Sequence, residues 1–304
     1  MTVQAFIFPG QGGQYAGQGA DWAAADPDVA ALFALADSLT GRPVSRLSFQ
    51  GPLEELSETR NLQPAALTVG LAAAKRLVKA GARPSFAAGH SLGEFGALAL
   101  AGALTDLEVL KLVAKRSELM QRAAEAAPGA MSAILGLDAR AVEAICELAR
   151  HEGQVTAANY NAPLQTVVSG EARAVAAAAR FAALKGGKAV PLPVSGAFHS
   201  PLMAQAAEAF ASLLDEVEFR RPLFPVVPNA LGRPVAEPAE IKEHLKRQMT
   251  SPVRWTETVS GLVEAGVDEF LECWPKAYLA PLVKKSLPQG SSAVVRSAAN
   301  WPAA

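Results

Sequence analysis

Ser91 is the residue of this chain whose surroundings best suit covalent chemistry, because it lies between two glycines in Gly89-His90-Ser91-Leu92-Gly93. A short apolar run from Ser85 to Ala88 precedes this segment, and a helix-like stretch from Leu92 to Ala101 follows it. A serine at such a strand-to-helix turn is a nucleophile elbow, which exposes the hydroxyl and leaves a backbone N–H free to stabilise an oxyanion. The pattern predicts Ser91 as a nucleophile. Because G-x-S-x-G also arises by chance, the partners of Ser91 decide the assignment.

A serine nucleophile needs a base, and the chain contains four histidines. His90 precedes the serine, so its side chain should point away from the hydroxyl. His151 ends a predicted helix and His244 lies on a polar helix, which favours structural or exposed positions. His199 lies in the segment Gly196 to Pro201, whose serine and proline are typical of a helix cap and first turn. A helix N-terminus disfavours the imidazolium, so His199 is either a neutral base or a surface histidine at a helix start.

Arg116 interrupts the apolar face of a predicted helix. Val109, Val113, Arg116 and Met120 recur at helical spacing and therefore share one stripe. Two interpretations remain open. Such an arginine either extends towards solvent or pairs with an internal carboxylate, or its planar fork holds a substrate carboxylate with two hydrogen bonds.

The composition of the 304 residues indicates a large core and argues against several functions. Half of the residues are apolar, the net charge is −1, and no basic cluster is interleaved with aromatic residues, which disfavours nucleic-acid binding. Cys146 and Cys273 lie far apart without a partner at metal-ligand spacing, so neither a disulfide framework nor a metal site is expected. No basic leader and no apolar stretch of ~20 residues indicates export or a membrane span. We expect a cytoplasmic protein without a metal or redox cofactor.

Strands and helices alternate on both sides of Ser91, which predicts an α/β fold with a mostly parallel sheet. Pro64 is expected in the first turn of a helix that runs to Ala80. Thr105-x-x-Glu108 is a capping box, and it predicts the start of a helix that runs to Ala126. The last elements expected are a strand over 269–273 and a final helix.

From Met131 the pattern changes to strand-helix-strand-strand-helix-strand, which is the order of a ferredoxin-like unit. Gly129 and Ser195-Gly196 flank this unit as hinges. The chain length suggests a main domain that carries an insertion. We therefore predict a large α/β-hydrolase-like domain formed by residues 1–129 and 197–304, with an inserted small ferredoxin-like α+β domain over 130–196.

Together these segments resemble the malonyl-CoA:acyl carrier protein transacylase family, the acyltransferases of fatty acid and polyketide synthesis, over nearly the whole chain. The shared motifs, in chain order, are Pro9-Gly10-Gln11-Gly12-Gly13-Gln14, Gln63-Pro64-Ala65, Gly89-His90-Ser91-Leu92-Gly93-Glu94, Arg116 with Met120, Asn159-Tyr160-Asn161, Ser195-Gly196-Ala197-Phe198-His199-Ser200, and Gln248 before Pro252-Val253-Arg254-Trp255. Matches in this order are very specific jointly. The resemblance implies malonyl transfer from malonyl-CoA to the phosphopantetheine thiol of a holo acyl carrier protein, for fatty acid biosynthesis.

The resemblance also implies catalytic roles for individual residues. Ser91 would attack the malonyl thioester, while His199 accepts its proton and later protonates the departing thiolate, so that a malonyl-serine ester forms. The backbone N–H groups of Gln11 and Leu92 would form the oxyanion hole. Family members usually orient the histidine through a backbone carbonyl near the position of Gln248, in place of a buried aspartate.

The substrate-binding residues follow from the same resemblance. Arg116 would bind the free malonyl carboxylate and so select malonyl over acetyl. Phe198 is the residue type associated in the family with malonyl over methylmalonyl, and Asn161 would line the pantetheine channel. Gln63 and Met120 complete the predicted substrate-binding set.

One departure from the family stands out. Where the family typically has a Gly-Pro-Gly turn after the last strand, this chain has Cys273-Trp274-Pro275-Lys276, with Tyr278 close behind. Trp274 must rearrange that loop, which leaves the shape of the site entrance and the donor or carrier preference open. A slighter departure is Leu62, where threonine is common.

Several alternatives share part of this pattern. Acyltransferases that act in trans on a polyketide synthase, and transacylase subunits of malonate decarboxylase, carry the same residues. A serine esterase expects a histidine late in the chain and a His-Gly-Gly-Gly turn, but His199 has about a third of the chain after it and the turn is absent. A non-catalytic carrier-binding protein would not require Ser91, His199 and Arg116 together.

The expected partners are a coenzyme A thioester and an acyl carrier protein. Because carrier proteins are acidic, a basic rim is expected near the site. Candidates are Lys75, Arg76 and Lys79 on one helix and Lys284-Lys285 near the end, although ordinary solvated charge explains them equally well. Family members are often monomeric, so a monomer is expected.

Overall fold

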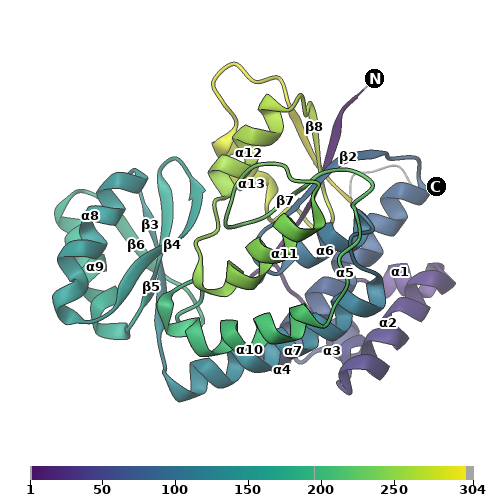
Figure 1. Ribbon diagram of the computed structural model, residues 1–304, viewed down its shortest axis with the longest axis horizontal. Helices are drawn as coiled ribbons and strands as arrows, with labels where there is room; N and C mark the ends of the chain where they lie inside the picture. Colours follow the sequence, from purple (N-terminus) through teal and green to yellow (C-terminus); the bar gives the residue numbers. More distant parts are fainter. Residues whose placement is uncertain (1, 195, 299–304) are drawn as a thin grey trace.

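The computed structural model describes residues 2–194 and 196–298, which form two β-sheets (Figure 1). The first sheet has the strand order β7-β2-β1-β8-β9 and is parallel in every pairing. Its strands are β1 (Gln4–Phe8), β2 (Pro84–Gly89), β7 (Val226–Val227), β8 (Glu269–Glu272) and β9 (Val294–Ser297). The second sheet, β4-β5-β3-β6, is antiparallel and contains β3 (Ala130–Leu135), β4 (Val155–Ala162), β5 (Gln165–Gly170) and β6 (Lys188–Pro191). The predicted α/β fold with a mostly parallel sheet is confirmed.

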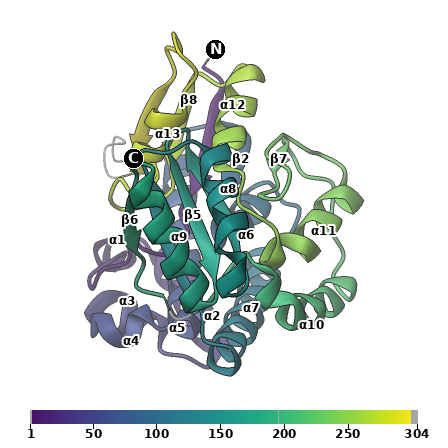
Figure 2. The same cartoon turned by 90° about the vertical axis from the view of Figure 1, so that its left-hand side faces the viewer.

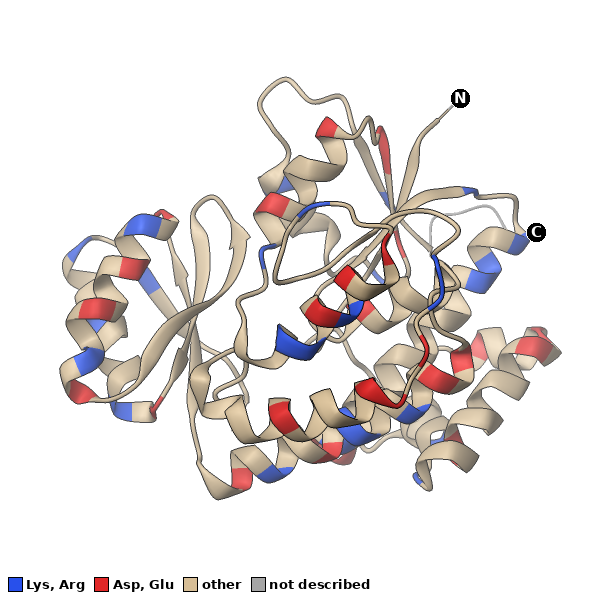
Figure 3. Ribbon diagram, viewed as in Figure 1, with Lys and Arg blue, Asp and Glu red and all other residues tan. Residues whose placement is uncertain are grey.

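Helices surround both sheets. Those outside the antiparallel unit are α1 (Ala20–Ala25), α2 (Pro27–Thr40), α3 (Val44–Gln50), α4 (Leu53–Ser57), α5 (Thr59–Lys79), α6 (Gly93–Leu100), α7 (Asp106–Ala126), α10 (Ala204–Asp215), α11 (Pro238–Arg247), α12 (Trp255–Glu264) and α13 (Ala280–Ser286). The antiparallel sheet carries α8 (Ala139–Ala149) and α9 (Ala172–Leu184). Short 3-10 helices are η1 (Arg150–Glu152), η2 (Pro201–Met203) and η3 (Gln248–Thr250). Acidic and basic residues are interspersed along the outer helices (Figure 3).

Strand β1 shows why the parallel sheet is covered on both faces. Phe6 and Phe8 join one core cluster with residues of α5, α6 and α7, whereas Ala5 and Ile7 join a second cluster with residues of α12 and α13. Successive side chains of a strand point to opposite faces of its sheet. A strand that is buried on both faces is therefore apolar throughout, as β1 is from Ala5 to Phe8.

The antiparallel unit has the element order β3-α8-β4-β5-α9-β6, which is the order predicted for residues 130–196. Helices α8 and α9 pack side by side on its sheet (Figure 2). Their apolar faces and the strands form a separate core that includes Ile134, Val142, Val168 and Ala178. The predicted hinge residue Ser195 lies outside the described residues, and the division into two domains stays a prediction.

A short stretch of backbone pairing, here called the seam, joins the two sheets. Val253, which precedes α12, donates its N–H to the carbonyl of Ala158 on β4 at 2.8 Å. Its own carbonyl accepts the N–H of Tyr160 at 2.9 Å. Strand β4 of the antiparallel sheet is thereby tied to the segment that leads into a helix of the parallel sheet.

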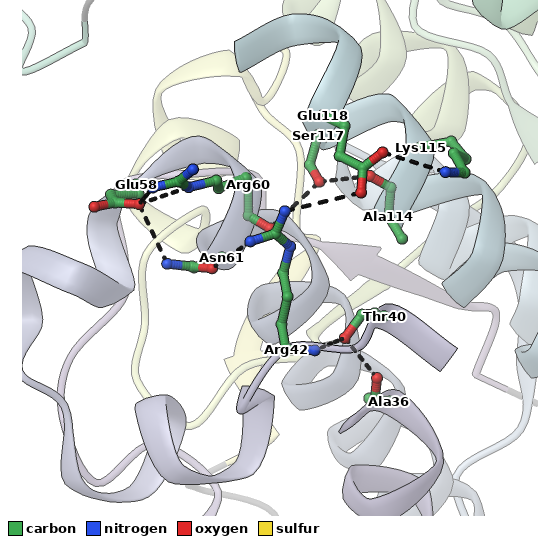
Figure 4. A network of polar contacts seen from close by, with 10 residues as sticks. All are labelled: Ala36, Thr40, Arg42, Glu58, Arg60, Asn61, Ala114, Lys115, Ser117 and Glu118. Carbon is green, nitrogen blue, oxygen red and sulfur yellow. Dashed lines mark hydrogen bonds and ion pairs between the residues drawn. The ribbon is translucent and has the colours of Figure 1, made fainter. Parts of the chain in front are cut away.

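Helix α5 begins at Thr59, earlier than the predicted start at Pro64. Pro64 lies inside the helix, where it has no N–H to donate to the carbonyl of Arg60. Ser117 of the neighbouring helix α7 approaches that carbonyl instead, with its hydroxyl at 3.4 Å (Figure 4). The same hydroxyl lies 2.8 Å from the carbonyl of Ala114, so its contact with Arg60 is the weaker of the two. The interior position of Pro64 is one that the first-turn preference does not predict.

Other elements differ in smaller ways from the prediction. Thr105 and Glu108 form the expected capping box of α7. The predicted final helix is α13, but a strand that the sequence pattern does not predict, β9, follows it and pairs in parallel with β8 at the sheet edge. Val294 on β9 is 46% exposed, so this short edge strand lacks a clear apolar pattern. No helix within the described residues has both the length and the apolar character of a membrane span.

The turn around Ser91 depends on close backbone contact between α6 and β1. A Cβ added at Gly93 would lie 2.0 Å from the carbonyl oxygen of Phe8, and one at Gly89 would lie 1.9 Å from the carbonyl carbon of Gly93. Only glycine permits such an approach. Both glycines of the elbow are therefore needed to pack the helix on the sheet.

We predict that Gly93→Ala lowers the free energy of unfolding by about 3 kcal/mol or more, because backbone must move to admit the methyl group. Urea denaturation measures the change. Gly136→Ala is the control, since Gly136 is left-handed (φ 84°) but has no atom within 4 Å of the added Cβ. It should cost only about 1 kcal/mol. Equal losses in both variants would contradict the steric argument.

Candidate active site

Ser91 lies at the bend between β2 and α6 and has a left-handed backbone, with φ of 51°. This conformation is rare outside glycine and persists only where the surroundings enforce it. The N–H of Ser91 donates to Asn229 Oδ1 at 2.7 Å, and the N–H of Gly93 donates to the carbonyl of His90 at 2.9 Å. The elbow is thus fixed from both sides, and Ser91 lines a pocket.

His199 lies next to Ser91, although 108 positions separate the two residues in the sequence. Its Nε2 is 2.8 Å from Ser91 Oγ. Its Nδ1 is 3.1 Å from the backbone carbonyls of both Gln248 and Ser251. A carbonyl accepts only from an N–H, so Nδ1 carries the proton and Nε2 remains free to accept the serine hydroxyl. The carbonyl of Ser251 is a partner that the sequence analysis did not identify.

The imidazole of His199 is held in its neutral form. Burial is the largest cause that lowers the pKa of His199 to about 3, and the nearby Arg116 and His90 contribute to the same shift. The following helix N-terminus predicts a neutral ring, but the largest cause of the low pKa is the loss of water around the ring. A neutral imidazole with a free Nε2 lone pair is able to act as a base.

The other three histidines have partners elsewhere. His90 Nε2 is 2.8 Å from Asn161 Oδ1, and its ring lines the same pocket as Ser91 without a hydrogen bond to Ser91 Oγ among the described residues. His151 is exposed beside α8. His244 is partly buried on α11 and contacts Arg247.

Arg116 is fully buried on α7 and forms hydrogen bonds beside the elbow. Its Nη1 donates to Gln63 Oε1 at 2.6 Å, and its Nη2 donates to Gln248 Oε1 at 2.9 Å and to Ser91 Oγ at 3.3 Å. Burial lowers the pKa of Arg116 to about 10, against the opposing charge of Glu94. The guanidinium of Arg116 therefore remains charged at neutral pH. It contacts Ser91 Oγ, which is also the partner of His199.

Glu94 and Asn229 form a buried polar network behind Ser91 that the sequence analysis did not assign. Asn229 holds both ends of the elbow, because Oδ1 accepts the Ser91 N–H while Nδ2 donates to the carbonyl of Gly89 at 2.7 Å. Glu94 Oε2 accepts from the N–H of Asn229 at 3.0 Å and from Gln248 Nε2 at 2.8 Å. Burial raises the pKa of Glu94, and these hydrogen bonds oppose the rise.

Sequence signals for these two residues differ. Glu94 is an acidic residue inside the otherwise apolar stretch that follows the elbow, which is a signal for a buried polar contact. Asn229 follows Val227 and Pro228 after a two-residue strand, and nothing in this spacing relates it to Ser91. Only the fold brings it there.

A pocket of about 370 Å³ opens beside Ser91 between the two sheets. The antiparallel sheet contributes Met131, Ala133 and Val167, and the parallel part contributes the elbow. Among the predicted site residues, those that line the pocket are Gln11, Ser91, Met120, Asn161, Phe198 and His199. Gln63, Leu92, Arg116 and Gln248 are not part of its lining and are buried.

The glycine-rich turn after β1 forms one wall of this pocket through Gln11. The carbonyl of Gln11 accepts the hydroxyl of Tyr278 at 3.0 Å. No hydrogen bond between described residues uses the backbone N–H of Gln11 or of Leu92. Both donors are therefore available for a bound oxygen atom.

An α/β fold that presents an elbow serine to a neutral histidine beside a pocket is typical of enzymes that transfer acyl groups through serine. A model of the acyl transferase domain matches residues 5–301. The malonyl CoA-acyl carrier protein transacylase of Bacillus subtilis (strain 168) is 43% identical over 287 residues, which span 94% of this chain and 90% of that protein. The chain belongs to the malonyl-CoA–acyl carrier protein transacylase family and is an acyltransferase.

Two similar structures support this assignment. The malonyl CoA-acyl carrier protein transacylase of Coxiella burnetii has a TM-score of 0.93 and 38% identity, covering 98% of this chain and 94% of that one. A malonyl-transacylase in complex with its holo type II polyketide acyl-carrier protein has a TM-score of 0.91 and 38% identity, covering 97% and 95%.

We predict that the rate constant for acylation of Ser91 by an acyl-CoA changes little between about pH 8 and pH 5, because His199 protonates only as the pH falls towards its low pKa. A histidine with the ordinary pKa of about 6.5 would lose most of its activity over this range. Rapid-quench mass spectrometry of the acyl-enzyme measures the rate constant, with circular dichroism as a control for folding. An inflection near pH 6.5 would falsify the assignment of a buried neutral base.

Proposed function

We propose that this acyltransferase moves the malonyl group of malonyl-CoA to the phosphopantetheine thiol of a holo acyl carrier protein, through a malonyl ester on Ser91. One observation carries the proposal: Ser91 Oγ has His199 Nε2 at 2.8 Å and Arg116 Nη2 at 3.3 Å. A base and a carboxylate-binding cation therefore meet at one hydroxyl. The names of the relatives support the same donor and acceptor.

In the first half-reaction His199 Nε2 takes the proton of Ser91, and Oγ attacks the thioester carbonyl. The carbonyl oxygen becomes an oxyanion, which the free N–H groups of Gln11 and Leu92 are proposed to stabilise. When the tetrahedral intermediate collapses, the C–S bond breaks and His199 returns the proton to the departing thiolate of coenzyme A. The carbonyls of Gln248 and Ser251 keep the ring oriented throughout.

The second half-reaction runs in the opposite sense with a different thiol. His199 accepts the proton of the phosphopantetheine thiol, and the thiolate attacks the ester carbonyl on Ser91. The ester C–O bond breaks, and the proton passes from His199 to the serine oxygen. Because coenzyme A leaves before the carrier reacts, the two substrates bind in turn, as in a ping-pong mechanism.

Arg116 is proposed to select the malonyl group. Gln63 and Gln248 hold its guanidinium beside Ser91, so a carboxylate two carbons from the ester carbonyl meets an oriented cation. An acetyl group has no carboxylate to pair with the buried cation, so transfer of acetyl is disfavoured. Met120 supports the arrangement, because its sulfur lies 3.3 Å from Gln63 Nε2. Phe198 and Asn161, which line the pocket, are proposed to exclude an α-methyl group and to contact pantetheine.

The finer assignments are proposed on the same basis. We place the enzyme in fatty acid biosynthesis, with a trans-acting polyketide role or a malonate decarboxylase subunit as alternatives and a serine esterase as a remoter one. The division into a hydrolase-like and a ferredoxin-like domain, the cytoplasmic location, the monomeric state and a reaction without metal or redox cofactor stay predictions. Within the described residues, no three of the His, Cys, Asp and Glu side chains cluster as metal ligands would.

For carrier docking, the structure favours one of the two basic candidates. Lys285 lines the pocket that contains Ser91. Lys75 and Lys79 do not line it, and they form ion pairs with Asp106 at 2.7 Å and Asp26 at 3.0 Å. We therefore propose that Lys284 and Lys285 meet the acidic carrier at the pocket mouth.

We predict that Ser91→Ala abolishes acylation by malonyl-CoA. Intact-protein mass after brief exposure to malonyl-CoA or acetyl-CoA, with and without holo carrier protein, measures both half-reactions. The proposal expects a malonyl adduct that needs Ser91 and moves to the carrier. An adduct lost only to water would indicate a hydrolase, and no adduct would indicate a binding protein.

We predict that Arg116→Ala lowers malonyl transfer by at least about 100-fold and reduces the preference over acetyl, because the carboxylate loses its paired cation. Arg116→Lys is the matched variant, since it keeps the charge but not the planar fork, and should restore only part of the preference. Ratios of kcat/KM for the two acyl-CoA substrates report this directly. Undiminished malonyl selectivity in Arg116→Ala would exclude the assigned role.

We predict that Lys285→Glu reduces transfer from the malonyl-enzyme to the carrier about tenfold, and more than it reduces acylation by malonyl-CoA. Lys79→Glu reverses a charge on the other candidate surface and should leave both steps unchanged. Single-turnover transfer at two salt concentrations separates the steps, because charge attraction weakens with salt. A larger effect of Lys79→Glu would assign docking to that surface instead.

A further inference from the structure

The loop from Trp274 to Tyr278, which departs from the family pattern, lies against the glycine-rich turn beside Ser91. The indole N–H of Trp274 donates to the carbonyl of Gly13 at 3.3 Å, and the hydroxyl of Tyr278 donates to the carbonyl of Gln11 at 3.0 Å. Two aromatic donors of one loop therefore hold two carbonyls of the turn. A Gly-Pro-Gly turn has no side-chain donor at the position of Trp274.

The loop is itself held by a buried carboxylate. Glu272, at the end of β8, is fully buried, and its carboxylate accepts the backbone N–H groups of Tyr278 at 2.8 Å, Leu279 at 2.7 Å and Ala280 at 3.0 Å. Trp274 is only 1% exposed. The backbone of Tyr278 is thereby anchored, while the residue is 38% exposed and its hydroxyl is placed by the bond to Gln11.

The turn and the loop also fit each other sterically. A Cβ at Gly12 would lie 2.1 Å from the hydroxyl oxygen of Tyr278, and one at Gly13 would lie 3.0 Å from its ring. Gly12 adopts a positive φ of 112°, so the turn depends on glycine for its backbone shape as well. The glycines leave room for an aromatic side chain directly over the turn.

We propose that Tyr278 is a positioning residue for acyl transfer: by holding the carbonyl of Gln11, its hydroxyl restrains the backbone of Gln11 and thereby the direction of the N–H that faces the reacting carbonyl on Ser91. The inference rests on the proposed function, in which this N–H stabilises the oxyanion. Gln11 and Tyr278 line the same pocket as Ser91, so the bond acts at the reaction site. A donor that is held in place before the reaction needs no reorganisation when charge develops.

The size of the expected effect follows from this indirect role. Removal of an oxyanion-hole donor costs about 10²- to 10³-fold in rate. Tyr278→Phe loosens such a donor without removing it, and it keeps the ring that forms the pocket wall. We therefore expect the acylation rate constant to fall about tenfold, with the affinity for malonyl-CoA nearly unchanged, because the ground-state thioester makes little use of the N–H.

The experiment measures single-turnover acylation by malonyl-CoA in wild type, Tyr278→Phe and Tyr160→Phe. Tyr160 is the matched control, because its hydroxyl bonds to Glu143 on α8, away from the turn. Titration calorimetry in the Ser91→Ala background, with and without Tyr278→Phe, measures malonyl-CoA affinity when no reaction follows. Melting temperatures identify a loss of folded protein.

The result expected is a slower acylation step in Tyr278→Phe alone, with affinity within about twofold of the reference. A Tyr278→Phe rate equal to wild type would overturn the proposal, and so would an equal loss in Tyr160→Phe or a loss explained by weaker binding. Failure of the proposed function is distinguishable, because wild type would then form no Ser91 adduct at all.

Discussion

The rest of the site depends on the contact between Ser91 Oγ and His199 Nε2, which are 2.8 Å apart. Both residues have a left-handed backbone, with φ of 51° for Ser91 and 57° for His199. They are the two non-glycine residues with positive φ in the described chain. Each such conformation costs of order 1–3 kcal/mol and persists only where neighbouring structure enforces it. For Ser91 that structure is the close packing of α6 on β1, which needs glycine at 89 and 93. For His199 it includes the two carbonyls that hold Nδ1.

Burial determines the chemistry that this contact supports. The loss of water keeps His199 neutral, so that its Nε2 faces the serine hydroxyl as a base. The same burial makes unpaired polar groups costly, and most polar atoms behind the elbow bond to one another, while Glu94 Oε1 and Arg116 Nε have no partner among the described residues. Gln248 is central to this arrangement: its carbonyl orients His199, its amide oxygen holds Arg116, and its amide nitrogen binds Glu94. One residue thus couples the base, the cation and the elbow helix.

The sequence predicts what local pattern determines. The elbow around Ser91, the apolar stripe that contains Arg116 and the order of the antiparallel elements can all be derived from spacing. Contacts between distant segments cannot. Pro64 lies inside a helix that packs against α7, and Asn229 reaches the elbow across 138 positions of sequence. Neither relation has a periodic signal, since both arise only when the helices and the sheet pack together. The family resemblance supplied the residue roles that spacing alone left open.

The seam of backbone hydrogen bonds through Val253 has a consequence for how a ligand is received. The pocket takes its lining from both sheets, and the seam fixes β4 relative to the segment that enters α12. Because the two walls of the pocket are already joined, they lose little conformational entropy when a ligand binds. A smaller part of the free energy gained from the contacts is therefore spent on ordering the protein. In a cleft between two untethered halves, the ligand itself would have to provide that ordering. Here the polypeptide backbone provides it during folding, before any thioester arrives.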